Sequence, residues 1–128
     1  MRHRLLTWSK MDLGLTTLSG VRELDKALSD SHHRPVLLFK HSYTCGISAE
    51  ALDELRAHID DARSVEVQYA MVTVQTHRDV SNTIAERLGV RHETPQAILV
   101  RDGRVVWSAS HFRVNAIEIQ KALAAGTS

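Results

Sequence analysis

Hydrophobic residues recur at helical spacing in four segments of the chain, which predicts four amphipathic helices. The repeating apolar positions are Val21, Leu24 and Leu28; Ile47, Ala51, Leu55 and Ile59; Val80, Ile84 and Leu88; and Ala116, Ile119 and Leu123. Ser19, Asp79 and Asn115 precede three of these segments and are predicted to cap those helices at their N-termini. Gly89 is predicted to end the third helix.

Short runs of apolar and β-branched residues between these segments predict strands. Residues 36–39 form an unbroken apolar run, which is typical of a central, buried strand. Residues 67–74 are rich in β-branched residues and predict a second strand. Residues 96–100 and 104–107 flank the pair Asp102-Gly103, so they predict a β-hairpin.

The order of these elements predicts the fold class. A short strand around residues 13–18 can precede a helix, a strand, a helix, a strand, a helix, the hairpin and a last helix. Strands separated by helices pair in parallel through right-handed crossovers, and the hairpin adds antiparallel strands. The sequence therefore predicts an α/β fold, a three-layer α/β/α domain with a small mixed sheet. We expect this domain to span residues 15–128 and residues 1–14 to form a flexible N-terminal arm.

Composition and charge narrow the function classes. The 128 residues suit one domain, and 43% hydrophobic with 24% charged residues are ordinary values for a globular protein. The formal net charge of +1 gives no electrostatic case for binding nucleic acid or an anionic membrane. No signal peptide or membrane-spanning apolar stretch is recognisable, so we expect a cytoplasmic protein. A single cysteine excludes an intrachain disulfide and a multi-cysteine zinc site, and no metal is expected.

The single cysteine, Cys45, lies between a predicted buried strand and a predicted amphipathic helix. At the N-terminal end of that helix, unpaired N–H groups and the helix dipole favour the thiolate, which is the nucleophilic form. Lys40 and His41 lie shortly before Cys45 and can add positive charge. A buried cysteine can instead act as a small hydrophobe. The polar and small residues on both sides of Cys45 favour the nucleophile.

Position 48 holds a serine, which completes a C-x-x-S motif with Cys45. Serine cannot resolve a mixed disulfide as the second thiol of a C-x-x-C motif does. It can still donate a hydrogen bond to the thiolate from one turn along the helix. The alternative interpretation of Ser48 is a polar residue in a first helical turn, and the residues alone leave both open.

Thr94-Pro95 opens the predicted strand at residues 96–100. In the functional interpretation this bond is cis and the preceding backbone pairs with an extended thiol substrate, although X–Pro bonds in general favour trans. His92, Glu93 and His111 lie in predicted loops, and each taken alone is interpreted as a surface residue. A Cys–His hydrolase, with His41 or His92 as the base, is an alternative function, but the sequence contains no recognisable oxyanion-hole motif to support it.

Three separated motifs resemble the monothiol bacilliredoxin family, which has a thioredoxin-like fold. The segment Lys40-His41-Ser42-Tyr43-Thr44-Cys45-Gly46-Ile47-Ser48 is similar to the family's K-H-S-x-T-C-P-I-S. The segment His92-Glu93-Thr94-Pro95-Gln96 is similar to H-E-S-P-Q, and Trp107-Ser108-Ala109-Ser110-His111 is similar to W-x-A-S-H. The resemblance covers the domain from about Leu15 to Leu123.

The resemblance implies a monothiol thiol–disulfide oxidoreductase. Family members remove bacillithiol, a low-molecular-weight thiol, from proteins that carry it as a mixed disulfide. The small thiol is then a co-substrate, and no bound cofactor is implied. Carried over to this sequence, Cys45 is the nucleophile, Pro95 is the cis proline, and His41 and Ser48 tune the thiol.

The same resemblance implies the substrate contacts and the partners. Thr44, Gly46 and Thr94 are expected to bind the substrate because they flank the nucleophile and the proline. S-thiolated proteins and the small thiol are the expected partners. We expect the protein to act as a monomer, without nucleic acid or membrane.

Two positions depart from the family pattern. Gly46 replaces proline, which weakens the preset first turn of the helix, and Thr94 replaces serine. Gly46 also makes the motif similar to the C-G-F-S of monothiol glutaredoxins, which bind a [2Fe–2S] cluster between two subunits. The Gly-Gly that follows the hairpin in glutaredoxins is absent from this sequence. An iron–sulfur carrier and a thioredoxin-fold adaptor with an inert cysteine are the alternative functions.

Overall fold

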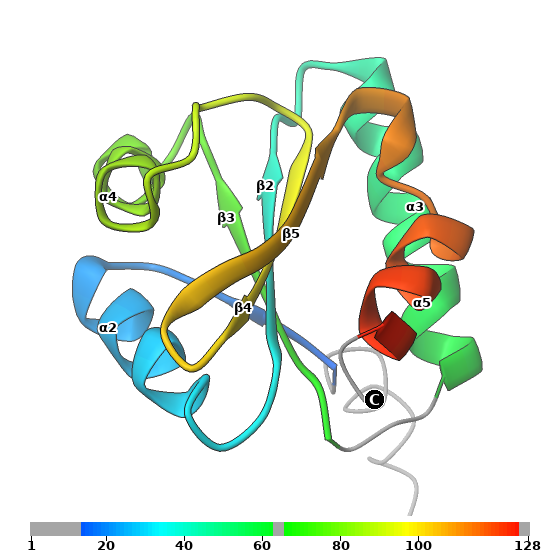
Figure 1. The fold of residues 1–128 in the computed structure, drawn as a ribbon. Coiled ribbons are helices and arrows are strands. Elements are labelled where there is room, and N and C mark those ends of the chain that lie inside the picture. Colours follow the sequence, from blue (N-terminus) through cyan, green and yellow to red (C-terminus); the bar gives the residue numbers. More distant parts are fainter. Residues whose placement is uncertain (1–13, 63–65, 126–128) are drawn as a thin grey trace, which may run out of the picture.

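A computed structural model describes residues 14–62 and 66–125 of the chain. Within them, five strands form one mixed sheet in the order β1-β3-β2-β4-β5 (Figure 1). The strands are β1 (Leu15–Thr17), β2 (Val36–His41), β3 (Gln68–Thr73), β4 (Gln96–Arg101) and β5 (Arg104–Ser110). β1 and β2 run parallel to β3, whereas β4 runs antiparallel to β2 and to β5. The sheet is therefore mixed, as the order of elements predicts.

Helices cover both faces of this sheet (Figure 1). One face carries α2 (Val21–Asp30) and α4 (Arg78–Leu88). The other carries α3 (Gly46–Ala62) and α5 (Ala116–Ala125), and a short 3-10 helix, η1 (His111–Arg113), precedes α5. The predicted three-layer α/β/α arrangement is confirmed.

Strand β2 divides the core into two layers because its side chains alternate between the faces of the sheet. Val36 and Leu38 pack into the cluster beneath α2 and α4, and Leu37 and Phe39 pack into the cluster beneath α3 and α5. A strand between two helical layers has no solvent-facing side, which explains its unbroken apolar run. β2 continues beyond that run to His41, so two polar residues enter a buried strand.

Two of the predicted N-caps are wrong. α2 begins after Gly20, which is the N-cap, so Ser19 lies one residue outside the helix. α4 begins before Asp79, which lies inside its first turn. A carboxylate in a first turn stabilises the helix through its dipole without capping it, and this explains why the pattern misplaced that boundary.

The other predicted helix ends are confirmed. The Oδ1 atom of Asn115 accepts the Glu118 N–H at 2.9 Å, which caps α5. Gly89 ends α4 in the left-handed conformation, with φ of 67°. The expected arm, residues 1–14, lies outside the described residues apart from Gly14.

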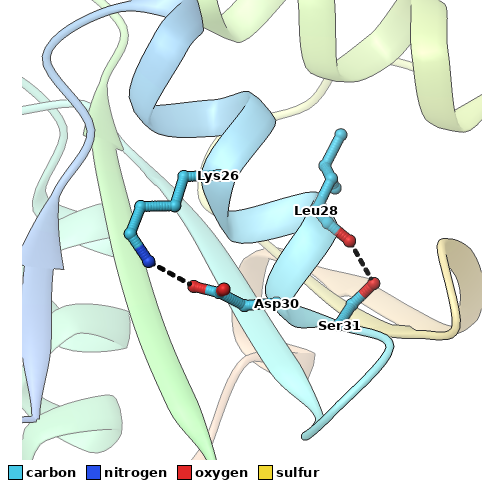
Figure 2. Close-up of polar contacts among 4 residues, drawn as sticks. All are labelled: Lys26, Leu28, Asp30 and Ser31. Carbon is cyan, nitrogen blue, oxygen red and sulfur yellow. Dashed lines mark hydrogen bonds and ion pairs between the residues drawn. The ribbon is translucent and has the colours of Figure 1, made fainter.

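The β4–β5 turn is fastened to the end of α2. Asp102 and Gly103 have φ angles of 53° and 76°, the positive values of the tight turn that an Asp-Gly pair predicts. Ser31 Oγ accepts the Gly103 N–H at 2.9 Å. The same hydroxyl donates to the Leu28 carbonyl at 2.5 Å (Figure 2). These bonds fix the end of the sheet opposite to the end of β2, where the candidate chemistry lies.

Candidate active site

The segments that carry the candidate residues meet at one edge of the sheet, the upper edge in Figure 1. β2 and β4 are antiparallel, and their register pairs Lys40 with Gln96. The segment that follows His41 therefore lies beside the segment that precedes Gln96. β5 ends at the same edge, because His111 donates its N–H to the Pro95 carbonyl at 2.9 Å. The topology thus brings the three sequence motifs together.

Cys45 is the residue immediately before α3, and its thiol is free and partly exposed. Its carbonyl accepts the Ala49 N–H at 3.1 Å, which starts the helix. Its own N–H donates to the Ser42 carbonyl at 3.3 Å and closes the turn between β2 and α3. The cysteine therefore lies at the N-terminus of a 17-residue helix, beside backbone N–H groups that have no intrahelical acceptor.

Ser48 is fully buried in the first turn of α3, and its hydroxyl joins the helix to the end of β2. The hydroxyl oxygen accepts the Ser42 N–H at 2.9 Å and lies 2.8 Å from His41 Nδ1. The sequence leaves open whether Ser48 donates to Cys45 or is a polar residue of the first helical turn. In the structure, its hydrogen bonds run to His41, at the end of β2, and to Ser42, the residue after it. Any effect of Ser48 on the Cys45 thiol therefore depends on whether its hydroxyl hydrogen is donated to His41 Nδ1 or not.

His41 ends β2 on the face covered by α3, where its ring stacks on Phe39 with centroids 6.0 Å apart. Burial, together with the charge of Arg56, lowers the pKa of His41. The imidazole is therefore neutral around neutral pH and does not supply the positive charge expected from the sequence. A neutral imidazole either donates from Nδ1 to Ser48 or accepts from it. Only the first tautomer leaves the Ser48 hydrogen available to the thiolate.

Lys40 lies on the opposite face of the sheet from His41, because neighbouring residues of a strand alternate. Its side chain is fully buried, and its Nζ lies 3.1 Å from His92 Nδ1. Burial lowers the pKa of Lys40 to about 8. The second cation that the sequence suggests beside Cys45 is therefore directed to the other side of the sheet.

Gln75, which the sequence analysis misses, holds the segment before Cys45. Its Nε2 donates to Ser42 Oγ at 2.7 Å and to Thr44 Oγ1 at 3.1 Å. Its Oε1 accepts the Tyr43 N–H at 3.3 Å, so one side chain fixes three consecutive residues. The position of Gln75 near Cys45 could have been inferred from the topology. Gln75 follows β3, and the carboxyl ends of parallel neighbouring strands such as β2 and β3 lie at the same end of the sheet.

The Thr94–Pro95 peptide bond is cis, the isomer that the family resemblance implies. Pro95 is buried, and Thr94 is partly buried directly before it. His111, whose N–H binds the Pro95 carbonyl, has a φ of 57°, and its Nδ1 lies 3.6 Å from Glu93 Oε1. His111 and Glu93, which the sequence suggests are ordinary surface residues, therefore flank the proline.

Gly46, the first residue of α3, is exposed, and a β-carbon placed there would meet no atom within 4 Å. Proline suits this first helical position because its fixed φ matches the helix and the N–H it lacks has no intrahelical acceptor there.

We expect Gly46→Pro to raise the free energy of unfolding by about 0.5–1 kcal/mol, because proline restricts the conformations of the unfolded chain. Urea denaturation measures the change, with Gly46→Ala as the control that lacks the proline ring. A proline variant less stable than wild type would contradict this expectation.

Apolar side chains are exposed beside the site. Tyr43 is 64% exposed and Phe112 is 70% exposed. A groove of about 620 Å³ lies between α3 and the η1–α5 segment, and Ile47, Phe112 and Ile117 contribute to its lining. The same groove is also lined by four carboxylates, those of Glu50, Asp53, Glu54 and Glu118, so its surface is mixed in character.

The described part of the chain has neither a group of side chains arranged to hold a metal ion nor a membrane-spanning helix. No group of three or more histidine, cysteine or acidic side chains within residues 14–62 and 66–125 could hold a metal ion. No helix within the same ranges is long and apolar enough to cross a membrane.

Comparison with solved structures defines the class of protein. A structure described as a candidate oxidoreductase with a thioredoxin fold is 28% identical, with a TM-score of 0.79 over 88% of this chain and 96% of that one. Fasciola hepatica thioredoxin is 16% identical, with a TM-score of 0.70 over 86% and 97% of the two chains. A mutant thioredoxin from Halobacterium salinarum NRC-1 is 21% identical, with a TM-score of 0.68 over 89% and 91%. The predicted thioredoxin-like fold is confirmed.

The family follows from the sequence itself. The family model for the monothiol bacilliredoxin BrxC matches residues 16–119. The chain belongs to the monothiol bacilliredoxin family, as the three motifs indicate, and is a thiol redox protein with a thioredoxin fold.

Proposed function

We propose that this protein is a monothiol thiol–disulfide oxidoreductase that removes a low-molecular-weight thiol, such as bacillithiol, from protein mixed disulfides. The observation that supports this most directly is a free, partly exposed Cys45 at the N-terminus of α3, with serine at position 48. S-thiolated proteins are then its partners, and the small thiol is a co-substrate. We propose that it acts as a cytoplasmic monomer.

In the first step, the Cys45 thiolate attacks the sulfur of the small thiol within the mixed disulfide. The disulfide bond between the target protein and the small thiol breaks, and a new one forms between Cys45 and the small thiol. The target cysteine leaves as a thiolate and takes a proton from water. The target is thereby reduced, and the oxidising equivalent moves to Cys45.

In the second step, another molecule of the small thiol attacks the adduct on Cys45. It forms the symmetrical disulfide of the small thiol and returns Cys45 to the thiolate. An external thiol is needed because Ser48 occupies the place of a resolving cysteine and the chain has no other cysteine. The adduct on Cys45 is therefore the stable intermediate of the cycle.

The surroundings of Cys45 support a protein as the first substrate. Thr94, before the cis Pro95, is proposed to pair through its backbone with the extended segment that carries the modified cysteine. Thr44 and Gly46 flank the nucleophile and are proposed to contact the small thiol. The exposed Tyr43 supplies apolar surface on the same side.

Intact-mass analysis tests this function. Wild-type protein mixed with a bacillithiolated test protein is expected to gain the mass of one small thiol per chain while the test protein loses it. The adduct is expected to persist until free small thiol is added, because no internal thiol can displace it.

Other outcomes would support the alternative functions. Visible absorption after anaerobic reconstitution with iron and sulfide would favour an iron–sulfur carrier. A Cys45 that fails to react with iodoacetamide at neutral pH, and takes up no small thiol, would favour an adaptor with an inert cysteine. Transfer that proceeds without any adduct on Cys45 would contradict the proposed mechanism.

A further inference from the structure

Lys40 is a charged residue in the sheet interior that the proposed thiol chemistry does not use. Its side chain is 0% exposed, and its Nζ contacts His92 Nδ1 at 3.1 Å. Burying an ammonium group is costly unless a polar partner is supplied, and an apolar side chain would fill this position without that cost. The pair with His92 is therefore the feature of Lys40 that needs a functional explanation.

His92 is placed to accept a hydrogen bond from the lysine. His92 is an exposed residue, but partial desolvation of its ring and the charges of Lys40 and Arg78 lower its pKa, while Glu93 acts in the opposite direction. Its imidazole is therefore neutral around neutral pH, with Nδ1 able to accept from the ammonium. Ser81 Oγ, on α4, lies 3.4 Å from the same nitrogen. These groups face His92 from β2, α4 and its own loop.

A second buried side chain holds the same loop. Gln96 lies directly opposite Lys40 in the β2–β4 ladder, so both side chains project to one face of the sheet. Its Nε2 donates to the Arg91 carbonyl at 2.9 Å. Its Oε1 is buried and has no hydrogen-bond partner within the described part of the chain. Lys40 and Gln96 thus form a polar floor beneath residues 91 and 92, shortly before Thr94.

We propose that Lys40 is a positioning residue: by donating to neutral His92, it fixes the loop before Pro95 so that Thr94 is held ready to dock a thiolated protein. The inference rests on the proposed function and adds to it the element that controls docking. A protonated His92 cannot accept from Lys40 and repels its charge, so acidification breaks this contact. Docking therefore weakens as His92 gains its proton.

Steady-state kinetics with a bacillithiolated test protein, measured for three variants, test the positioning role of the Lys40–His92 contact. Lys40→Met removes the donor but keeps much of the volume, His92→Leu removes the acceptor, and His92→Gln keeps an oxygen that can accept. We expect the first two to raise KM about tenfold with little change in kcat, and His92→Gln to stay close to wild type. The rate of Cys45 alkylation by iodoacetamide is expected to stay within about twofold of wild type.

The pH dependence supplies a readout that a purely structural role would not move. In wild type, KM is expected to rise on acidification below the ordinary histidine value of about 6.5, because His92 is then protonated. In Lys40→Met this rise is expected to disappear. An unchanged KM in Lys40→Met, or a His92→Gln variant as impaired as His92→Leu, would overturn the proposal. If Lys40→Met does not fold, the two His92 variants decide the question alone.

A measurement without substrate separates this inference from the proposed function. NMR titration of the His92 ring in wild type is expected to show a midpoint below the ordinary value, with Nδ1 unprotonated at neutral pH. In Lys40→Met the midpoint is expected to move to higher pH, because a neighbouring positive charge is removed. A wild type that removes no small thiol from any protein would refute the proposed function. An unmoved His92 midpoint would refute the Lys40–His92 contact, whatever the activity.

Discussion

Cys45→Ser is expected to reduce removal of the small thiol from a thiolated protein to the rate seen without any catalyst. Cys45 is the single thiol of the chain, so the variant has no group that can form a mixed disulfide. A serine hydroxyl before α3 remains protonated and cannot attack sulfur. The loss is therefore expected to be complete.

The fold is expected to survive this substitution. The Cys45 hydrogen bonds described in the structure are made by its backbone, to Ser42 and Ala49, and serine keeps both. Circular dichroism and thermal unfolding check this, and Gln120→Ala, at an exposed position on α5, serves as the matched control with unchanged activity. Activity retained by a folded Cys45→Ser protein would show that another group performs the chemistry.

The fold could be predicted largely because its central strands, β2 and β4, are buried on both faces. The run at residues 36–39 indicates a strand buried between two layers, and the structure places it at the centre of the sheet. The Asp102-Gly103 turn was also predictable, because the residue pair selects a tight turn with positive φ angles. The predictions of Ser19 and Asp79 as N-caps are wrong because a polar side chain near the start of a helix need not be the cap itself.

The candidate site was predictable as a set of positions but not as a set of contacts. Cys45 and Pro95 carry strong local motifs, and the antiparallel pairing of β2 with β4 brings their segments to one edge. Position 40 shares the two-residue period of Val36 and Leu38, so its face could be inferred from the sequence. Its partner could not, because His92 lies 52 residues along the chain and meets it only through the sheet register.

The positive charge expected near the Cys45 thiol also depends on contacts that form only in the folded structure. From spacing alone, Lys40 and His41 both add positive charge near Cys45. In the folded protein, burial favours the neutral form of His41, and strand alternation directs Lys40 to the other face. The N-terminus of α3, with its unpaired N–H groups, therefore remains beside Cys45 after these two side chains are set aside.

Ser48 offers the sharpest test of one-thiol chemistry. Residues three apart in a helix have Cα atoms about 5 Å apart, within the range that a disulfide spans. In Ser48→Cys, the new thiolate can attack the sulfur of Cys45 in the adduct, form an internal disulfide and release the small thiol. We expect this variant to shed its adduct without added thiol, whereas wild type holds it.

The variant also loses hydrogen bonds, and its control must lose the same ones. Ser48 accepts the Ser42 N–H and binds His41, so both Ser48→Cys and Ser48→Ala leave a buried donor unpaired. Each is expected to lower the free energy of unfolding by about 1–3 kcal/mol in the reduced form. Oxidised Ser48→Cys is expected to recover part of that loss through its new crosslink, and Ser48→Ala is not.

Intact mass, followed over time after the adduct is formed, distinguishes the two mechanisms. For Ser48→Cys we expect the adduct to disappear and the protein to end two hydrogen atoms lighter than its reduced form. For wild type and Ser48→Ala we expect the adduct mass to persist until the free small thiol is supplied. If wild type sheds its adduct as fast as Ser48→Cys, then water or another group resolves the disulfide, and the serine at position 48 does not define the chemistry.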